Sequence, residues 1–139
     1  MLARLFRRLF SSGSPAMNVP PFALPSDAEL TTTASGLKYC MVEDGDGAAP
    51  KSSDKVTVHY AGWLTDGTPF DSSYGRGSPA TFPLNGVIPG WTEGVQLMKP
   101  GAIYKFVIPP ELAYGAHGAP PVIGPGATLL FQVQLLSVG

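Results

Sequence analysis

The chain has 139 residues, of which 44% are hydrophobic and 14% charged, and its net charge is −1. This length supports one domain with a modest core, and the low charge content excludes a disordered polyelectrolyte. No basic cluster lies in the part expected to fold, which argues against nucleic acid as a partner. The 17 glycines and 15 prolines favour a fold rich in loops and sheet.

The first 33 residues differ from the remainder of the chain. Residues 1–16 place apolar side chains on one helical face and arginines on the other. This pattern is typical of an organellar transit peptide or of a helix that lies on an anionic membrane. An extension without function is a third alternative. Prolines at positions 15, 20, 21 and 25 predict a stiff linker, so we place the segment at residues 1–33 and the domain at residues 34–139.

The same segment bears on location. No apolar run approaches the roughly 20 residues that span a bilayer, so we expect no transmembrane segment and a cytoplasmic protein. A mitochondrion or plastid is the alternative if residues 1–16 are a transit peptide. Cys40 is the only cysteine, so no internal disulfide can form. Its neighbours are apolar, and we interpret it as a small core residue.

Alternating apolar residues predict strands in the first half of the domain. Residues 37–41 place Leu37, Tyr39 and Met41 on one face, and residues 55–64 continue the pattern after a turn-rich connection. The dipeptide Asp66-Gly67 predicts a hairpin, because it tolerates the positive φ of a tight turn. The following stretch is irregular and ends in a short strand around Phe82.

The stretch NGVIPGWTEGVQLMKPG, residues 85–101, predicts a short helix. Pro89 suits its first position, and the Pro-Gly pair at positions 100 and 101 stops it. Gly94 thins the helix beside Trp91, which leaves room for another group. The apolar residues that share one helical face are Ile88, Trp91, Val95 and Met98.

The last part of the chain returns to strands. Residues 102–109 predict a strand, residues 109–115 a short helical turn and residues 115–126 a long Gly/Pro loop. Residues 127–138 predict a closing strand, with Gln132 and Gln134 facing water. Four or five half-buried strands and one amphipathic helix indicate an α+β fold, in which the helix covers one face of an antiparallel sheet.

The familiar catalytic motifs are missing from this sequence. There is no Gly-x-Ser-x-Gly elbow, no phosphate-binding loop and no His-Glu-x-x-His. His59 is expected on a strand surface and His117 in a loop, and with Cys40 they form no zinc set, so we expect no metal and no cofactor. Aromatic residues next to turns remain as candidates for a site, although core packing is their default role.

Four blocks of sequence point to a family: VTVHYAGWLTDGTPFDSSYGRG, ATFPLNGVIPGWTEGVQLMKPG, IPPELAYG and GATLLFQVQLL. In this order, and from about Ser35 to the C-terminus, they resemble the FKBP-type peptidyl-prolyl isomerases, the immunophilins that bind tacrolimus and rapamycin. The chain looks most like a single-domain bacterial, plant or organellar member. The resemblance implies a half-barrel, in which a strongly twisted antiparallel sheet wraps around one short helix and a pocket lies between them.

The resemblance also implies the residues of that pocket. Trp91 would be the floor under a proline ring, while the Ile88 N–H and the Tyr114 hydroxyl would donate to the flanking carbonyls. The implied catalytic residues are Tyr60, Asp71, Ile88, Trp91, Tyr114 and Phe131. The implied substrate-binding residues are Phe70, Arg76, Phe82, Val87 and Ile123.

Asp71 and Arg76 have two interpretations. The resemblance places Asp71 at the pocket edge with Arg76 and the Tyr60 hydroxyl as partners, which would make a buried carboxylate tolerable. Alternatively, Asp71 caps the turn at residues 71–73 and Arg76 is solvated. The two roles can coexist.

The expected function is acceleration of X–Pro bond rotation in protein folding, by non-covalent stabilisation of the twisted amide in an apolar aromatic pocket. The alternative is a chaperone module that binds proline-containing segments without turnover. Expected partners are proline-containing polypeptides and macrolides of the tacrolimus and rapamycin type. We expect a monomer.

Overall fold

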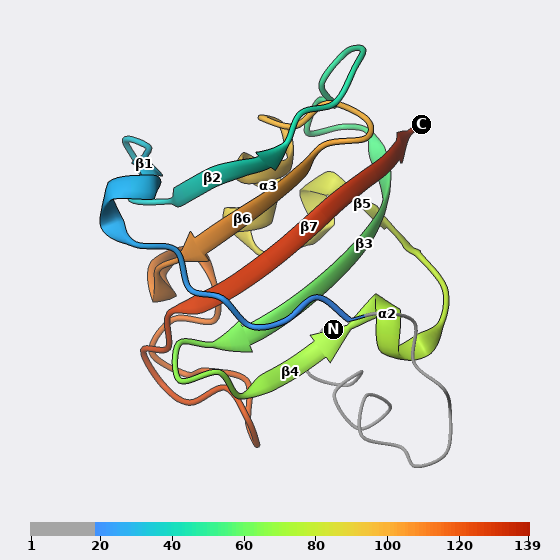
Figure 1. The fold of residues 1–139 in the computed structure, drawn as a ribbon. Helices are drawn as coiled ribbons and strands as arrows, with labels where there is room; N and C mark the ends of the chain where they lie inside the picture. Colours follow the sequence, from blue (N-terminus) through green and yellow to red (C-terminus); the bar gives the residue numbers. More distant parts are fainter. Residues whose placement is uncertain (1–18) are drawn as a thin grey trace.

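The computed structural model describes residues 19–139, and the amphipathic pattern predicted for residues 1–16 lies outside the described residues. Figure 1 shows a strongly twisted sheet with the main helix against one face. All strand pairs are antiparallel, in the order β1-β2-β6-β7-β3-β4, and β5 pairs with β3. The strands are β1 Thr31–Thr32, β2 Lys38–Glu43, β3 Lys55–Leu64, β4 Pro69–Ser72, β5 Ala80–Pro83, β6 Ile103–Ile108 and β7 Leu129–Val138.

The helical elements are short. The main helix is α3, Pro89–Val95, and α2, Ser73–Arg76, forms a single turn after β4. Three 3-10 turns complete the described chain: η1 Asp27–Glu29, η2 Leu84–Gly86 and η3 Pro110–Leu112. The predicted α+β class and half-barrel arrangement are confirmed, with two short strands, β1 and β4, that the sequence pattern did not predict.

The long central pair β3 and β7 forms the middle of the core. Alternation in β7 is as predicted: Leu129, Phe131, Val133 and Leu135 are all 0% exposed, whereas the intervening glutamines are only partly buried. The Asp66–Gly67 hairpin is also confirmed. Gly67 has φ +94°, a conformation that glycine adopts without strain, and β4 returns from it along β3.

Helix α3 packs close against β6, because two of the helix positions in contact with the strand are glycines. A Cβ at Gly90 would lie 2.5 Å from Ile108, and one at Gly94 would lie 2.6 Å from Phe106. The room that the sequence predicted beside Trp91 is therefore filled by the Phe106 ring of β6. Pro89 is the first helical residue, as expected.

The outer face of the sheet carries a second, smaller core. Ala61, Trp63 and Leu130 are buried there, and the described N-terminal segment crosses this face (Figure 1). The Phe22 ring meets Trp63 edge-on at 6.0 Å, while the Lys105 Nζ donates a 3.0 Å hydrogen bond to the Ala23 carbonyl. Residues 19–33 thus contact the domain directly.

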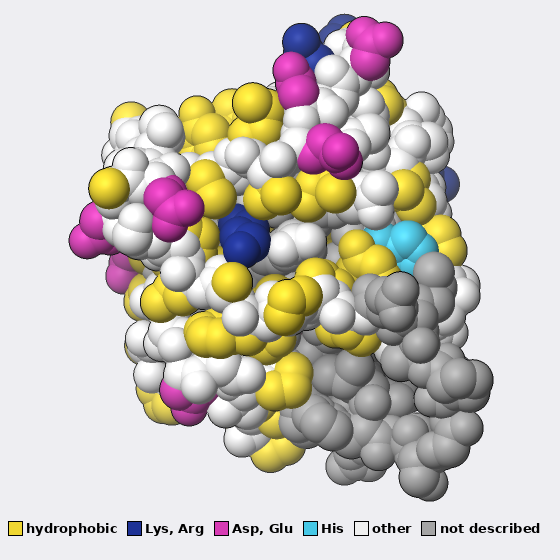
Figure 2. Space-filling model, in the orientation of Figure 1, with side chains coloured by type: hydrophobic (Ala, Val, Ile, Leu, Met, Phe, Trp, Pro, Cys, Tyr) yellow, Lys and Arg dark blue, Asp and Glu magenta, His cyan; other side chains and the backbone are white. Residues whose placement is uncertain are grey.

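Met41 and Cys40 lie outside the core, contrary to expectation. Met41 is 53% exposed and Cys40 is only partly buried. The reason is the length of β1, which pairs only with Lys38 and Tyr39. Beyond Tyr39, no strand among residues 19–139 pairs with β2 on that edge. Figure 2 shows this outer face, where hydrophobic side chains remain exposed among polar ones.

Candidate active site

Five aromatic rings meet in one cluster between the sheet and α3. Trp91 is at its centre and is 1% exposed. Its ring centroid lies 5.2 Å from Tyr60, 5.3 Å from Phe131 and 5.8 Å from Phe82, each time nearly perpendicular. Edge-to-face contacts of this kind are favourable beyond their buried area. Five different elements supply the five rings: Tyr60 from β3, Phe70 from β4, Phe82 from β5, Trp91 from α3 and Phe131 from β7.

Gly62 makes part of this arrangement possible. A Cβ at this β3 position would lie 2.7 Å from the Phe70 ring and 2.8 Å from the Phe131 ring. Because the position has no side chain, the two rings meet edge-on at 5.4 Å directly over the strand. No role in the site was predicted for Gly62, although a glycine inside a strand is a known signal of close approach.

Half-buried residues border the aromatic cluster. Val87, Ile88 and Tyr114 pack against it and keep part of their surface in contact with solvent. Ile123 is 1% exposed and belongs to the same cluster. The loop that carries it is ordered by its own backbone, since Ala119 and Ile123 exchange hydrogen bonds of 2.7 and 3.2 Å.

Two N–H groups, one at this border and one at the centre of the cluster, lack acceptors among the described residues. Among residues 19–139, no hydrogen bond is formed by the Ile88 backbone N–H, while the Ile88 carbonyl accepts from Trp91 and Thr92 at the start of α3. The Trp91 Nε1 is buried and likewise has no partner within the described part of the chain. An unsatisfied buried donor such as the Trp91 Nε1 is rare, and a functional role is one explanation for it.

Asp71 is the acceptor of a closed hydrogen-bond network at the edge of the cluster. Its side chain is 0% exposed and accepts from the Tyr60 hydroxyl at 2.7 Å and from Arg76 Nη1 at 2.9 Å. Arg76 Nη2 donates in turn to the Tyr60 oxygen at 3.1 Å. This is the partnership that the resemblance implied, and the alternative of a solvated Arg76 is wrong, since its side chain is only 12% exposed.

The capping role that the alternative interpretation gave to Asp71 belongs mainly to the neighbouring Ser72. Ser72 Oγ accepts from the backbone N–H groups of Tyr74 and Gly75 and so caps α2. Asp71 contributes a single local bond, accepted from the Ser72 N–H at 2.9 Å. Both interpretations of Asp71 therefore hold in part, with the capping function shifted by one residue.

Burial and pairing fix the protonation states of this network. Burial raises the pKa of the Tyr60 hydroxyl far above its ordinary range, and the adjacent Asp71 raises it further. Burial also raises the pKa of Asp71, against the opposing hydrogen bonds from Tyr60 and Arg76. Burial opposes the charge of Arg76, but its bonds to Tyr60 and Asp71 prevail and raise the pKa of the guanidinium. Tyr60 and Arg76 consequently remain donors at physiological pH.

His59 is buried rather than on the strand surface, and this corrects the prediction. It is 9% exposed because the Tyr74 ring of α2 stacks on it at 4.7 Å. Its Nδ1 lies 2.9 Å from Ser73 Oγ, which also accepts a 2.7 Å bond from the Tyr60 backbone N–H. His59 and Ser73 thereby hold the corner between β4 and α2 against β3.

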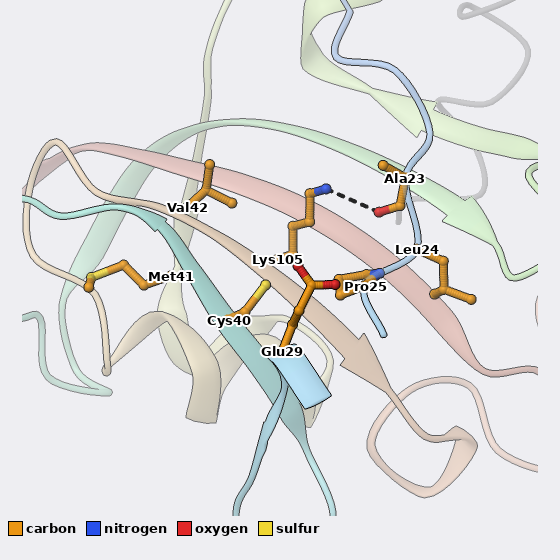
Figure 3. A pocket seen from close by; sticks show the side chains of 8 residues that line it. All are labelled: Ala23, Leu24, Pro25, Glu29, Cys40, Met41, Val42 and Lys105. Carbon is orange, nitrogen blue, oxygen red and sulfur yellow. Dashed lines mark hydrogen bonds between the residues drawn. The ribbon is translucent and has the colours of Figure 1, made fainter. Parts of the chain in front are cut away.

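A separate hollow of about 570 Å³ lies on the outer face, away from the aromatic cluster (Figure 3). The N-terminal segment forms one side of it, and β2 and β6 form the other. Cys40 lines it, and burial raises the pKa of this thiol, which lowers its reactivity. In the part of the chain that the structure describes, no group of three His, Cys, Asp or Glu side chains could hold a metal ion.

All eleven residues implied by the resemblance lie together in this region. Nine belong to, or pack against, one hydrophobic cluster, and Asp71 and Arg76 join it through the Tyr60 hydroxyl. The model of the FKBP-type peptidyl-prolyl cis-trans isomerase family matches residues 47–136. The chain belongs to this family.

Individual relatives agree with the family model. The peptidyl-prolyl cis-trans isomerase Mip of Coxiella burnetii is 56% identical over 109 residues, which cover 78% of this chain and 47% of that protein. The crystal structure of FkpA from Escherichia coli has a TM-score of 0.77 and 54% identity, and the match covers 81% of this chain and 52% of that one. The chain therefore spans about half the length of these relatives.

One relative corrects the expected location. The protein named outer membrane protein MIP of Legionella longbeachae is 50% identical over 109 residues, covering 78% of this chain and 47% of that protein. The cytoplasmic location expected from the sequence is therefore wrong. Within residues 19–139, no helix has the length and apolar character needed to cross a bilayer.

Proposed function

We propose that this chain is an active peptidyl-prolyl isomerase whose site is the aromatic cluster around Trp91. The observation that carries the proposal is the convergence of three aromatic rings from three strands on one indole, with Phe70 packed behind Phe131. A prolyl ring reaches this cluster past the half-buried side chains of Val87, Ile88 and Tyr114 and packs over the Trp91 floor. Apolar rings of this size favour a compact apolar ligand such as proline.

The Ile88 N–H supplies a fixed hydrogen-bond donor at the entrance. It has no acceptor among the described residues, and its position at the start of α3 is set by Pro89. A substrate carbonyl next to the proline accepts this bond and aligns the peptide. Donors that are held in place in advance stabilise a transition state without further reorganisation.

The reaction needs no acid, base or nucleophile. Rotation about an X–Pro amide has a barrier of about 20 kcal/mol and takes tens of seconds without a catalyst. About 4–5 kcal/mol of barrier reduction is enough for roughly 100 turnovers per second. The planar amide is more charge-separated than the twisted one, so a dry aromatic site favours the twisted form.

The Tyr60, Asp71 and Arg76 network holds one ring of the site in position. Tyr60 contacts Trp91 through its ring and Asp71 through its hydroxyl, so its orientation is fixed from both ends. The Arg76 guanidinium lies 5.6 Å from the centre of the same ring and adds a cation–π attraction.

The second candidate function is a module that binds proline-containing segments without turnover, acting as a chaperone. The two are separated by following cis–trans exchange of a Leu-Pro or Phe-Pro peptide by NMR with catalytic amounts of the protein. Acceleration of exchange supports the enzyme. Binding without acceleration supports the module.

Proline-containing polypeptides are the substrate class of this family, and the further partners are proposals. We expect macrolides of the tacrolimus and rapamycin type to compete with peptide, because they would occupy the same apolar cluster. Competition in the exchange assay tests this expectation. For assembly, we propose a monomer, and the molar mass measured by light scattering tests this.

A further inference from the structure

A groove of about 450 Å³ lies on the solvent side of α3, beside the proposed proline site. We call it the α3 groove. Its connection to the site is Val87, which lines the groove and also packs against the aromatic cluster. The lining residues are Asn85, Val87, Pro89, Thr92, Glu93 and Gln96.

The walls of the groove are fixed by hydrogen bonds. Thr92 Oγ1 donates to the Leu84 carbonyl at 2.7 Å, which ties α3 to η2. Gln96 Nε2 donates to the Thr92 carbonyl at 2.8 Å. Four of the lining residues are spaced three and four apart along the helix and therefore share one face. The groove is thus formed before any ligand arrives.

Glu93 is the one charged side chain among the lining residues. It is partly buried, and the hydroxyl of Ser35, in the connection between β1 and β2, donates to its Oε1. Among the described residues it forms no salt bridge, since the ion pairs found there join Lys38 to Asp27 and Arg76 to Asp71. The carboxylate is therefore held in place with acceptor capacity left over.

We propose that the α3 groove is a substrate subsite for a lysine or arginine side chain located two or three residues from the isomerised proline. The inference rests on the proposed isomerase function. An extended peptide covers about 3.3–3.6 Å per residue, so a chain that leaves the proline site past Val87 enters the groove within a few residues. There Glu93 offers the complementary charge.

The test uses peptides with a common Ala-Ala-Leu-Pro-Ala-Ala core and Lys, Gln or Glu two positions before or two positions after the proline. We expect the wild-type protein to show a kcat/KM about two- to fivefold higher for Lys than for Glu in one of the two sets, as for an exposed ion pair. The difference is expected in KM rather than kcat, because the contact is present equally in ground and transition states. It is expected to shrink at high salt.

A matched pair of variants tests whether the preference for Lys over Glu peptides comes from Glu93. Glu93→Gln is expected to bring the Lys-to-Glu ratio close to one. Glu43→Gln makes the same change in net charge on exposed β2 outside the groove and is expected to keep the wild-type ratio. Equal turnover of Lys and Glu peptides by the wild type would overturn the proposal, and so would a ratio that survives Glu93→Gln.

Binding of the same peptides, measured by isothermal titration calorimetry, separates this inference from the proposed function. If no peptide is isomerised, the isomerase proposal fails. A preference for Lys in binding that Glu93→Gln removes would still support the subsite. Equal binding of Lys and Glu peptides would overturn it.

Discussion

The Tyr60 hydroxyl donates a 2.7 Å hydrogen bond to the Asp71 carboxylate, and Arg76 bonds to both. The three side chains come from β3, β4 and α2, and none is more than slightly exposed. A carboxylate and a guanidinium buried in this way are stable only as a pair. Three elements that follow one another along the chain, β3, β4 and α2, are therefore joined by one network that also orients a ring of the proposed site.

Loss of one partner from this network is expected to destabilise the fold. Asp71→Leu leaves the Arg76 charge without a partner, and we expect a loss of about 3–5 kcal/mol in the free energy of unfolding. Turnover of a Leu-Pro peptide is expected to fall as well, because the Tyr60 hydroxyl loses the carboxylate that accepts its hydrogen bond. Chemical denaturation and the exchange assay measure the two effects.

The double variant Asp71→Leu/Arg76→Leu is the control for that prediction. Because it removes the unpaired charge, it is expected to recover part of the stability lost in the single variant. Additive losses would show that the ion pair is not the stabilising contact. Unchanged turnover in Asp71→Leu would leave Asp71 with only its local turn bond.

Gly62→Ala is expected to disturb the aromatic cluster from the β3 backbone. The new methyl group would lie 2.7–2.8 Å from the Phe70 and Phe131 rings, and both rings are 0% exposed. We expect a stability loss of about 1–3 kcal/mol, as for an overpacked core, together with lower turnover. The matched control is Gly124→Ala, where no atom lies within 4 Å of the added carbon and stability is expected to change by less than about 1 kcal/mol.

Stability is expected to depend on pH through His59. Burial, and then the neighbouring Arg76, lower the pKa of this imidazole below its ordinary value near 6.5. Between these two pKa values the unfolded chain binds a proton that the folded chain does not. The free energy of unfolding should therefore fall as pH decreases from about 7 through 6.5, with a slope of at most ~1.4 kcal/mol per pH unit.

Two histidine variants test whether His59 causes this pH dependence, with the free energy of unfolding measured by denaturation between pH 7.5 and 5.5. His59→Gln is expected to flatten the pH dependence in this range. His117 is exposed, so His117→Gln should retain the wild-type slope. A slope that persists in His59→Gln would assign the effect to another group.

The N-terminal segment is expected to stabilise the domain through Phe22. This ring packs on Trp63 and over the Gly67 turn, and it is 38% exposed. Phe22→Ala should cost about 1 kcal/mol, given its partial burial, and should shift Trp63 fluorescence to longer wavelength. Leu24→Ala removes a comparably exposed side chain, 46% exposed, outside that contact and should leave the emission unchanged.

Elements with local determinants could be predicted from the sequence. The β7 alternation follows from residue periodicity alone, and the hairpin follows from the turn chemistry of Asp66-Gly67. Pro89 likewise marks the first residue of α3. The site residues were placed through the resemblance to a family, since aromatic residues in a small domain carry no signal that separates a site from a core.

The incorrect predictions concern residues whose burial depends on elements distant in the sequence. Alternation predicted Met41 inside, but the two-residue β1 stops short of it. His59 was predicted at the surface, but Tyr74 of α2 covers it. The first outcome depends on strand pairing and the second on a helical turn, and no local sequence pattern predicts either. Gly62 was overlooked for the same reason, because the rings that need its space come from β4 and β7.

The most direct test of the account is the cis–trans exchange rate of a Leu-Pro peptide with a Trp91→Leu variant, compared with Val95→Ala. Val95 is a fully buried residue of the same helix that contributes no ring to the cluster, so its variant controls for loss of packing. With both variants shown to be folded by circular dichroism, Trp91→Leu is expected to lose at least about tenfold in kcat/KM, or about 1.4 kcal/mol, and Val95→Ala to remain near wild type. Wild-type protein that leaves exchange at the uncatalysed rate, or a folded Trp91→Leu variant as fast as wild type, would contradict the account.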